Sequence, residues 1–436
     1  MSRGHIHLAA RVNAMNGRKL RRVAPSPEHR LNGAWIPSRK VEYGYYCAIS
    51  YSTVAAYVGI EVPLLAAGIL MSLAALCFVK SGARRREIYA PIALLLACQI
   101  GHVLVQQLAH DVFVLSDSLR WFILWIFSTI IVQSLCLRRG FLLRCSIVLF
   151  AIGIIAVPHL GFNLDVVDRA RADIDIGGGL KNPNGLAAWF GFCVVSFGIA
   201  AIEMKRTNLW RWFYSAASIL SLLVVALTVS RGALLGCALA LTVGLRRLLS
   251  RAFIPLLLLI CLGWLVFEAG LVNHFVGNYE ERATEETGRF LLWPRVVDRI
   301  VRSPLVGVGV PEISTYVPER GDSISTPHNS FLFLALSSGF VPFVLFLGFW
   351  LKAIRSSFSD NKGSEYTPFR IPLLLYCLVA FLLADISAEP WSVLSLAIAA
   401  GPPLLFRREP SFIGRQSPSR KLVPRLNRPT RTRVLQ

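Results

Sequence analysis

The sequence predicts an all-α, polytopic membrane protein with about twelve transmembrane helices and one large periplasmic loop lobe. Of its 436 residues, 54% are hydrophobic and only 16% are charged. The mean hydropathy is +0.55, and a soluble chain of this length does not bury so much apolar surface. Apolar runs recur along the chain, and the loops between them alternate between basic and weakly charged. These observations together indicate a chain that crosses a bilayer many times.

Most apolar runs approach the roughly 20 residues that a straight helix needs to cross a bilayer. Glu61 and Pro63 mark the turn between the first two runs. The predicted spans are 43–60, 63–79, 88–108, 119–137, 141–157, 183–202, 213–229, 232–245, 252–270, 329–350, 371–387 and 391–406.

The lysines and arginines predict that both termini are cytoplasmic. In that orientation 35 of the 46 basic residues lie in the two tails and the inner loops, as the positive-inside rule requires. This distribution also accounts for the net charge of +21, which faces membrane lipids and requires no nucleic acid. All 9 cysteines lie in or beside apolar spans, so we expect buried thiols and no disulfide framework.

The spans and loops divide the chain into five parts. Residues 1–42 form a basic cytoplasmic tail that lacks an apolar leader stretch and is expected to be disordered. Nine spans occupy 43–270, and the large periplasmic loop with the predicted chemistry occupies 271–328. Three spans occupy 329–406, and a second basic cytoplasmic tail occupies 407–436.

The shorter outer loop, 158–182, ends in a run of glycines that leads into the sixth span. Backbone N–H groups before a helix can bind an anion, so Asn182 and Asn184 are predicted to contact substrate. Capping of the helix by these asparagines is the alternative. Asp173 and Asp175 have the Asp-x-Asp spacing of metal-dependent sugar transferases, with a solvated charged face as the alternative. No outer His, Asp and Glu cluster has ligand spacing, so no metal is predicted.

Three predicted catalytic side chains lie at the outer face. Arg231 occupies a tight Ser-Arg-Gly turn between two spans, and snorkelling to lipid headgroups is the alternative. The glycine of this turn begins a Gly-x-x-x-Gly spacing that permits close helix packing. Arg289 follows Thr-Gly at the mouth of a helix, where anions are favoured. His328 lies at the outer threshold of the tenth span, with a purely structural role as the alternative.

The remaining predicted substrate contacts follow the same loop. The pattern from residue 288 to 302 suits a helix on the membrane surface, broken or bent at a proline, and Trp293 lies within it. Gly307 and Gly309 leave a backbone that a ligand can approach closely. Asn329 directly follows the candidate histidine.

In order and spacing, these motifs resemble the bacterial O-antigen ligase and O-antigen polymerase superfamily over roughly residues 180–345. The resemblance implies a C-type glycosyltransferase architecture in the bacterial inner membrane. It implies transfer of a glycan from undecaprenyl diphosphate to an acceptor hydroxyl on the periplasmic face, without metal ion or other cofactor. Arg231 and Arg289 match the family's diphosphate-binding arginines, and His328 matches its proposed catalytic histidine. The implied partners are the undecaprenyl-diphosphate-linked saccharide donor and, as acceptor, lipid A–core or a growing glycan.

Three alternatives stay open at this point. Ligase and polymerase, of O-antigen or exopolysaccharide, are not separated by the motifs. A transporter or flippase of lipid-linked glycan would place charges deep within the spans and would not need His328, yet ionisable residues lie mostly at the span ends. An oligosaccharyltransferase using Asp173, Asp175 and a metal ion would be sensitive to chelators.

Overall fold

The structure is a computed structural model. It describes residues 36–58, 64–80, 117–156, 160–162, 172–174, 183–204, 207–228, 230–244, 289–305, 307–309, 313–318, 322–324, 326–358, 366–384 and 390–400. Helices account for 84% of these residues, which confirms a mostly helical protein. The predicted spans 88–108 and 252–270 and most of both basic tails lie outside the described residues, so the span count and the separate periplasmic lobe stay predictions.

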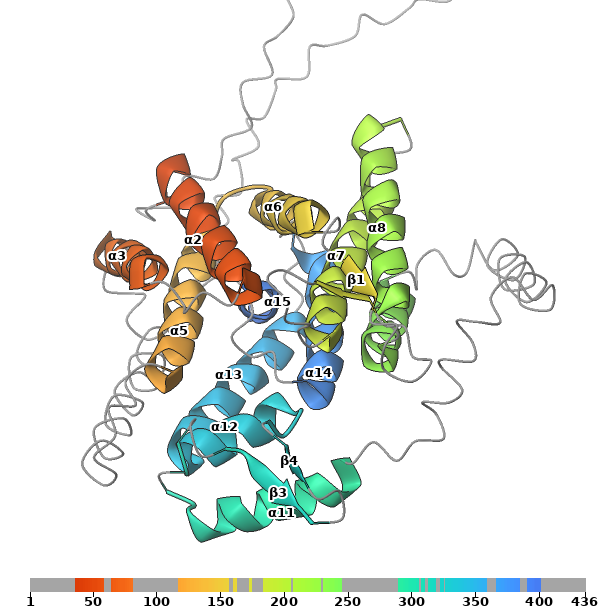
Figure 1. Cartoon of the computed structure of the whole chain (residues 1–436). Coiled ribbons are helices and arrows are strands. Elements are labelled where there is room, and N and C mark those ends of the chain that lie inside the picture. The colour runs from red at the N-terminus through yellow and green to blue at the C-terminus, as the bar shows by residue number, and fades with distance from the viewer. Residues whose placement is uncertain are drawn as a thin grey trace, which may run out of the picture. The chain divides into compact units, whose positions relative to one another are not determined.

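Before residue 250, the helices lie where the apolar runs predict them (Figure 1). They are α2 (Arg39–Val58), α3 (Leu64–Lys80), α5 (Asp117–Leu135), α6 (Phe141–Ala156), α7 (Pro183–Glu203), α8 (Leu209–Leu227) and the helix Arg231–Gly244. Among the described helices, three are long and apolar enough to cross a membrane, and two of these are α7 and α8. The chain is a membrane protein by this composition.

The tenth span differs from its predicted bounds of 329–350. The structure divides this run into α12 (Ser330–Ser338) and α13 (Phe340–Phe358). Gly339 separates them with a φ of 80° and a ψ of −173°, a backbone conformation that glycine adopts without strain. The third helix of membrane-spanning length is therefore α13, and α12 is a short helix that leads into it.

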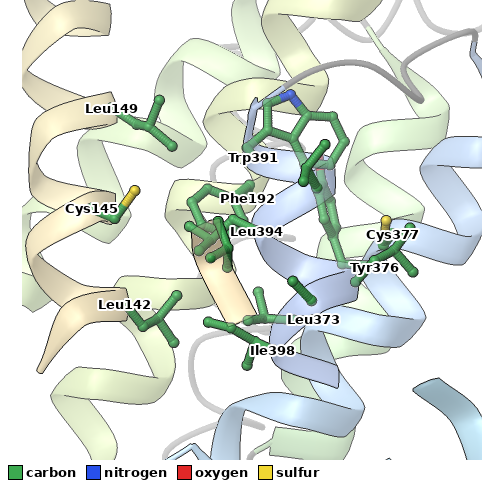
Figure 2. Close-up of a cluster of buried hydrophobic side chains, with 14 of the residues drawn as sticks. Leu142, Cys145, Leu149, Phe192, Leu373, Tyr376, Cys377, Trp391, Leu394 and Ile398 are labelled. Carbon is green, nitrogen blue, oxygen red and sulfur yellow. The ribbon is translucent and has the colours of Figure 1, made fainter. Parts of the chain in front are cut away.

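The main core joins α6 and α7 to α14 (Thr367–Leu383) and α15 (Pro390–Ala399). Figure 2 shows apolar side chains from these helices meeting in one cluster, with Tyr376 beside Trp391 and ring centroids 5.8 Å apart. The buried Tyr376 hydroxyl donates a hydrogen bond of 2.7 Å to the Ala188 carbonyl of α7. This bond satisfies a polar group that would otherwise be buried without a partner, and it ties α14 to α7.

The helix Arg231–Gly244 also lies close against α14. A Cβ atom on Gly232 would stand 2.8 Å from Cδ1 of Leu383, and one on Gly236 would stand 3.1 Å from Cδ2 of Tyr376. A larger side chain at either position would require the Leu383 or Tyr376 side chain to shift. The close packing predicted from the Gly-x-x-x-Gly spacing is confirmed.

A small second core lies in the loop region before α13. It joins α11 (Arg289–Arg302) to α12 and to β3 (Thr315–Val317), which pairs antiparallel with β4 (Asp322–Ile324) (Figure 1). α11 runs unbroken through Pro294. The helix continues there because its apolar face packs on this core.

A second hairpin lies in the segment between α6 and α7. It pairs β1 (Leu160–Phe162) with β2 (Ala172–Ile174), and Asp173 lies opposite Gly161 in the register. Neither hairpin was predicted, since strands of three residues are too short to show an alternating pattern.

A buried ionic cluster ties α2 to the α5–α6 turn. The Glu42 carboxylate, 2% exposed, accepts hydrogen bonds from Arg138 Nε at 2.7 Å and Arg144 Nε at 2.6 Å. The Tyr366 hydroxyl, just before α14, donates to the Arg138 carbonyl at 2.8 Å. Burial acts to raise the pKa of Glu42, but hydrogen bonds from Arg144, Tyr46 and Arg138 outweigh burial and lower it.

We expect Glu42→Gln to lower the free energy of unfolding by about 1–3 kcal/mol at pH 7, the range for hydrogen bonds to charged groups. The loss stays below that of a fully buried ion pair because the Arg144 side chain is 44% exposed. Since folding lowers the pKa of Glu42, its stabilisation is present above the unfolded-state pKa of about 4.3 and is lost as the pH falls through the folded value. Equilibrium unfolding in mixed micelles at pH 7 and in the acid range measures both effects.

Glu203→Gln is the matched control, because this carboxylate lies exposed at the end of α7. Equal destabilisation by both variants at pH 7 would contradict a stabilising role for the cluster. So would a Glu42→Gln deficit that persists undiminished below about pH 3.

Candidate functional site

The carboxyl end of α14 is the point where the candidate site residues meet. The last carbonyl groups of a helix have no partner within it and carry the negative end of its dipole. Side chains from α11 and α12 donate to three consecutive carbonyls there. The bonds run from Asn329 Nδ2 to Leu382 O (3.3 Å), from Arg289 Nη2 to Leu383 O (2.9 Å) and from Ser330 Oγ to Ala384 O (2.9 Å).

Asn329 uses both ends of its amide in this arrangement. As the N-cap of α12, its Oδ1 accepts from the backbone N–H of Phe331 at 2.9 Å and of Leu332 at 3.0 Å. Its Nδ2 donates to Leu382 O, and the residue is 5% exposed. The side chain therefore joins the start of α12 to the end of α14, and the substrate contact predicted for it stays a prediction.

His328 is held between two fixed neighbours. Its φ of 51° is in the left-handed region, which histidine adopts more readily than most residues. On one side, Trp293 Nε1 donates to the Pro327 carbonyl at 3.0 Å, and on the other Asn329 caps α12. The half-buried imidazole has its Nδ1 3.3 Å from Thr326 Oγ1. These contacts on both sides hold the turn that carries His328.

The residue that follows Arg231 packs on the end of α14. Arg231 is the exposed first residue of the helix Arg231–Gly244. The next residue, Gly232, packs on the Leu383 side chain, and the carbonyl of Leu383 accepts from Arg289. Arg289 and the residue that follows Arg231 therefore both contact Leu383 at the end of α14.

The start of α7 is tied to the same turn. The buried Ser230 hydroxyl donates to Asn184 Oδ1 at 3.2 Å. Asn184 is half-buried in the first turn of α7, so of the two predicted asparagines it is the one that the structure links to the site. Asn182 lies outside the described residues.

The two glycines after α11 approach the protein's own backbone. Gly307 has a φ of 72°, and a Cβ atom on it would lie 2.6 Å from the Leu336 carbonyl oxygen. Val308 N donates to Leu336 O at 2.8 Å and Gly309 N donates to Ser337 O at 3.0 Å. The space expected for a ligand at Gly307 is filled by the end of α12, and substrate contact by these glycines stays a prediction.

The sequence pattern did not predict the roles of Ser330 and the α14 carbonyls. A backbone carbonyl has no side-chain signature, and a serine beside an asparagine at a helix start reads as an ordinary cap. For the candidate metal site, Asp175 lies outside the described residues. Within the described ranges, no group of three His, Cys, Asp or Glu side chains gathers.

The arrangement supplies two kinds of chemistry. Guanidinium groups bind phosphate oxygens through paired hydrogen bonds, and Arg289 has its guanidinium oriented by the Leu383 carbonyl. An imidazole changes protonation near neutral pH and can accept a proton from a hydroxyl. Of the three predicted catalytic side chains, Arg289 bonds the end of α14 directly. Arg231 precedes Gly232, which packs on Leu383, and His328 precedes Asn329, which bonds Leu382.

We expect Asn329→Ala to lower the free energy of unfolding more than Asn208→Ala. Both asparagines cap a helix, but Asn208, the N-cap of α8, bonds Trp210 N within its own helix start. Loss of a cap costs about 1 kcal/mol, and loss of the bond to Leu382 adds about 0.5–1.5 kcal/mol. Hydrogen exchange at the start of α12 and equilibrium unfolding measure the two terms, and equal losses in both variants would contradict the link to α14.

Comparison with known proteins gives one result for this region. Residues 216–347 match the family model described as O-Antigen ligase, and no curated protein matches the chain. The matched region extends from within α8 to within α13. Residues 216–347, which include Arg231, Arg289 and His328, are therefore similar to the O-antigen ligase family that the motifs resemble.

Proposed function

We propose that this protein is a membrane glycosyltransferase that moves a glycan from undecaprenyl diphosphate to an acceptor hydroxyl on the periplasmic face. The observation that supports the proposal is that Arg289 bonds the end of α14, and that the residues directly after Arg231 and His328 contact the same end, within the region that matches the O-antigen ligase family model. The acceptor is lipid A–core for a ligase, and a growing O-antigen or exopolysaccharide chain for a polymerase.

The two arginines are assigned to the donor diphosphate. As the glycosidic bond breaks, its electron pair moves to the diphosphate oxygen, and negative charge grows there. Guanidinium groups placed on these oxygens stabilise the transition state more than the bound donor. Because Leu383 O already orients Arg289, less reorganisation is needed when this charge develops.

His328 is assigned to the acceptor. As the acceptor oxygen attacks the anomeric carbon, the hydroxyl proton passes to the imidazole. In the tautomer with the proton on Nδ1, which lies 3.3 Å from Thr326 Oγ1, the nitrogen that accepts the hydroxyl proton is Nε2. The diphosphate leaves with its charge held by the arginines, so this scheme uses neither a metal ion nor a nucleotide sugar.

The proposal places the protein in the bacterial inner membrane with both termini cytoplasmic. Support comes from α14, whose two ends contact the two predicted sides of the chain. Near its start, Tyr366 bonds the basic α5–α6 turn at Arg138, which the charge pattern assigns to the cytoplasm. At its end, it accepts from Arg289 of the loop assigned to the periplasm.

We expect Arg289→Lys and Arg231→Lys each to lower turnover by about 30- to 1000-fold, since a charge-assisted contact in the transition state contributes about 2–4 kcal/mol. Lysine keeps the charge but loses the paired hydrogen bonds. Turnover is measured on purified protein with lipid-linked donor. Arg302→Lys is the control on the same helix, because Arg302 is exposed and ion-paired with Asp298. Normal turnover by folded Arg289→Lys would remove that arginine from the mechanism.

Replacement of His328 is expected to lower turnover by about 100- to 10,000-fold, the range for a general base. His328→Asn is the sharper variant, because asparagine tolerates the left-handed backbone that alanine strains. Wild-type turnover should fall in acid, because a protonated imidazole cannot accept the hydroxyl proton, and this limb should vanish in the residual activity of the variant. Near-normal turnover by His328→Asn with a loss in His328→Ala would assign His328 to backbone shape alone.

A further inference from the structure

α11 carries more apolar surface than the protein core covers. Leu292 and Val296 are buried in the small core that α11 shares with β3 and α12. Val297 and Val301, in contrast, are 46% and 68% exposed, and Leu305 just beyond the helix is 71% exposed. Residues four apart lie on one helix face, so Val297 and Val301 form a second apolar face, about 100° around the helix from Val296.

The charged residues of α11 occupy a different sector. Asp298 and Arg302 form an ion pair of 2.6 Å, and both side chains are more than half exposed. Arg299, beside them, donates to Ser314 O at 2.7 Å and Thr315 Oγ1 at 3.0 Å. Outside the protein core, α11 therefore has an apolar side and a charged side, which is the pattern of helices that lie in a membrane interface.

The exposed apolar side continues onto α13. Phe340 N donates to the Pro304 carbonyl at 2.7 Å, which brings Leu305 next to the start of that helix. Phe340, Val341 and Val344 in the first turns of α13 are 58%, 45% and 43% exposed. α13 is long and apolar enough to cross a membrane, so we expect its exposed apolar side to contact acyl chains. The apolar residues of α11 extend this surface sideways.

We propose that Val297, Val301 and Leu305 insert among the phospholipid acyl chains of the adjoining leaflet, so that α11 lies along the membrane surface. Phospholipid is the occupant because this aliphatic face is continuous with the side of α13 that we expect to contact lipid. Insertion also removes from water an apolar patch that is otherwise exposed. A consequence that rests on the proposed function is that Arg289, at the start of α11, is held at headgroup depth, where the donor diphosphate lies.

Photocrosslinking in nanodiscs tests the proposal. Full-length protein carries benzoylphenylalanine at Val301 or, as the matched control on the charged side, at Asp298, in discs of phosphatidylethanolamine and phosphatidylglycerol without glycan donor. After irradiation, mass spectrometry measures phospholipid adducts on α11. We expect an adduct yield at Val301 at least about five-fold above that at Asp298. Val344 of α13 serves as the positive control, and Val297 replaces Val301 if the latter variant does not fold.

Three results would overturn the proposal. Equal phospholipid yields at the apolar and charged positions would show no preferred insertion of either side. An adduct at Val301 that forms only after lipid-linked donor is added would assign the face to the donor's prenyl chain. Crosslinks from Val301 to protein would assign it to another protein surface. The readout is an adduct and not turnover, so it is independent of whether the protein transfers glycans.

Discussion

The end of α14 presents carbonyl groups that its own helix cannot satisfy, and the site is arranged around the side chains that satisfy them. A buried carbonyl without a partner costs about 1–3 kcal/mol. The bonds from Asn329, Arg289 and Ser330 avoid this cost, and they hold the first residues of α11 and α12 against the end of α14. His328 directly precedes the capping Asn329, so the backbone position of His328 depends on that cap. Arg231 is placed by the glycine that follows it, which packs on the same terminus.

The position of that terminus depends in turn on the rest of α14. Near its start, Tyr366 bonds the α5–α6 turn, whose arginine also pairs with Glu42. In its middle, Tyr376 bonds α7 and contacts Gly236 of the neighbouring helix. Within a bilayer the hydrophobic effect does not drive helices together, so close approach at glycines and hydrogen bonds between helices take a larger share of the stabilisation. α14 uses both.

α11 bears on three parts of the proposed reaction: the binding of the diphosphate, the position of the base and the location at the membrane surface. Its first residue is a candidate diphosphate ligand, and Trp293, one turn later, bonds the carbonyl just before the candidate base. One side of its later turns packs on the small second core, and another side leaves apolar side chains exposed. A lipid-linked donor has to present its diphosphate at the membrane surface, and a helix that carries an arginine and an apolar side together suits that location.

The sequence alone determined what is local: the apolar runs that became α6, α7 and α8, the close packing at Gly232 and Gly236, and the motifs that resemble the O-antigen ligase family. Hydropathy averages over many residues, so it did not show that Gly339, with its positive φ, divides the tenth span. Only the tertiary structure revealed that Gly307 accommodates the end of α12, and that Arg289, Asn329 and Ser330 meet at the last carbonyls of α14. That meeting is made by backbone carbonyls, which every residue has, and their position depends on packing between distant helices.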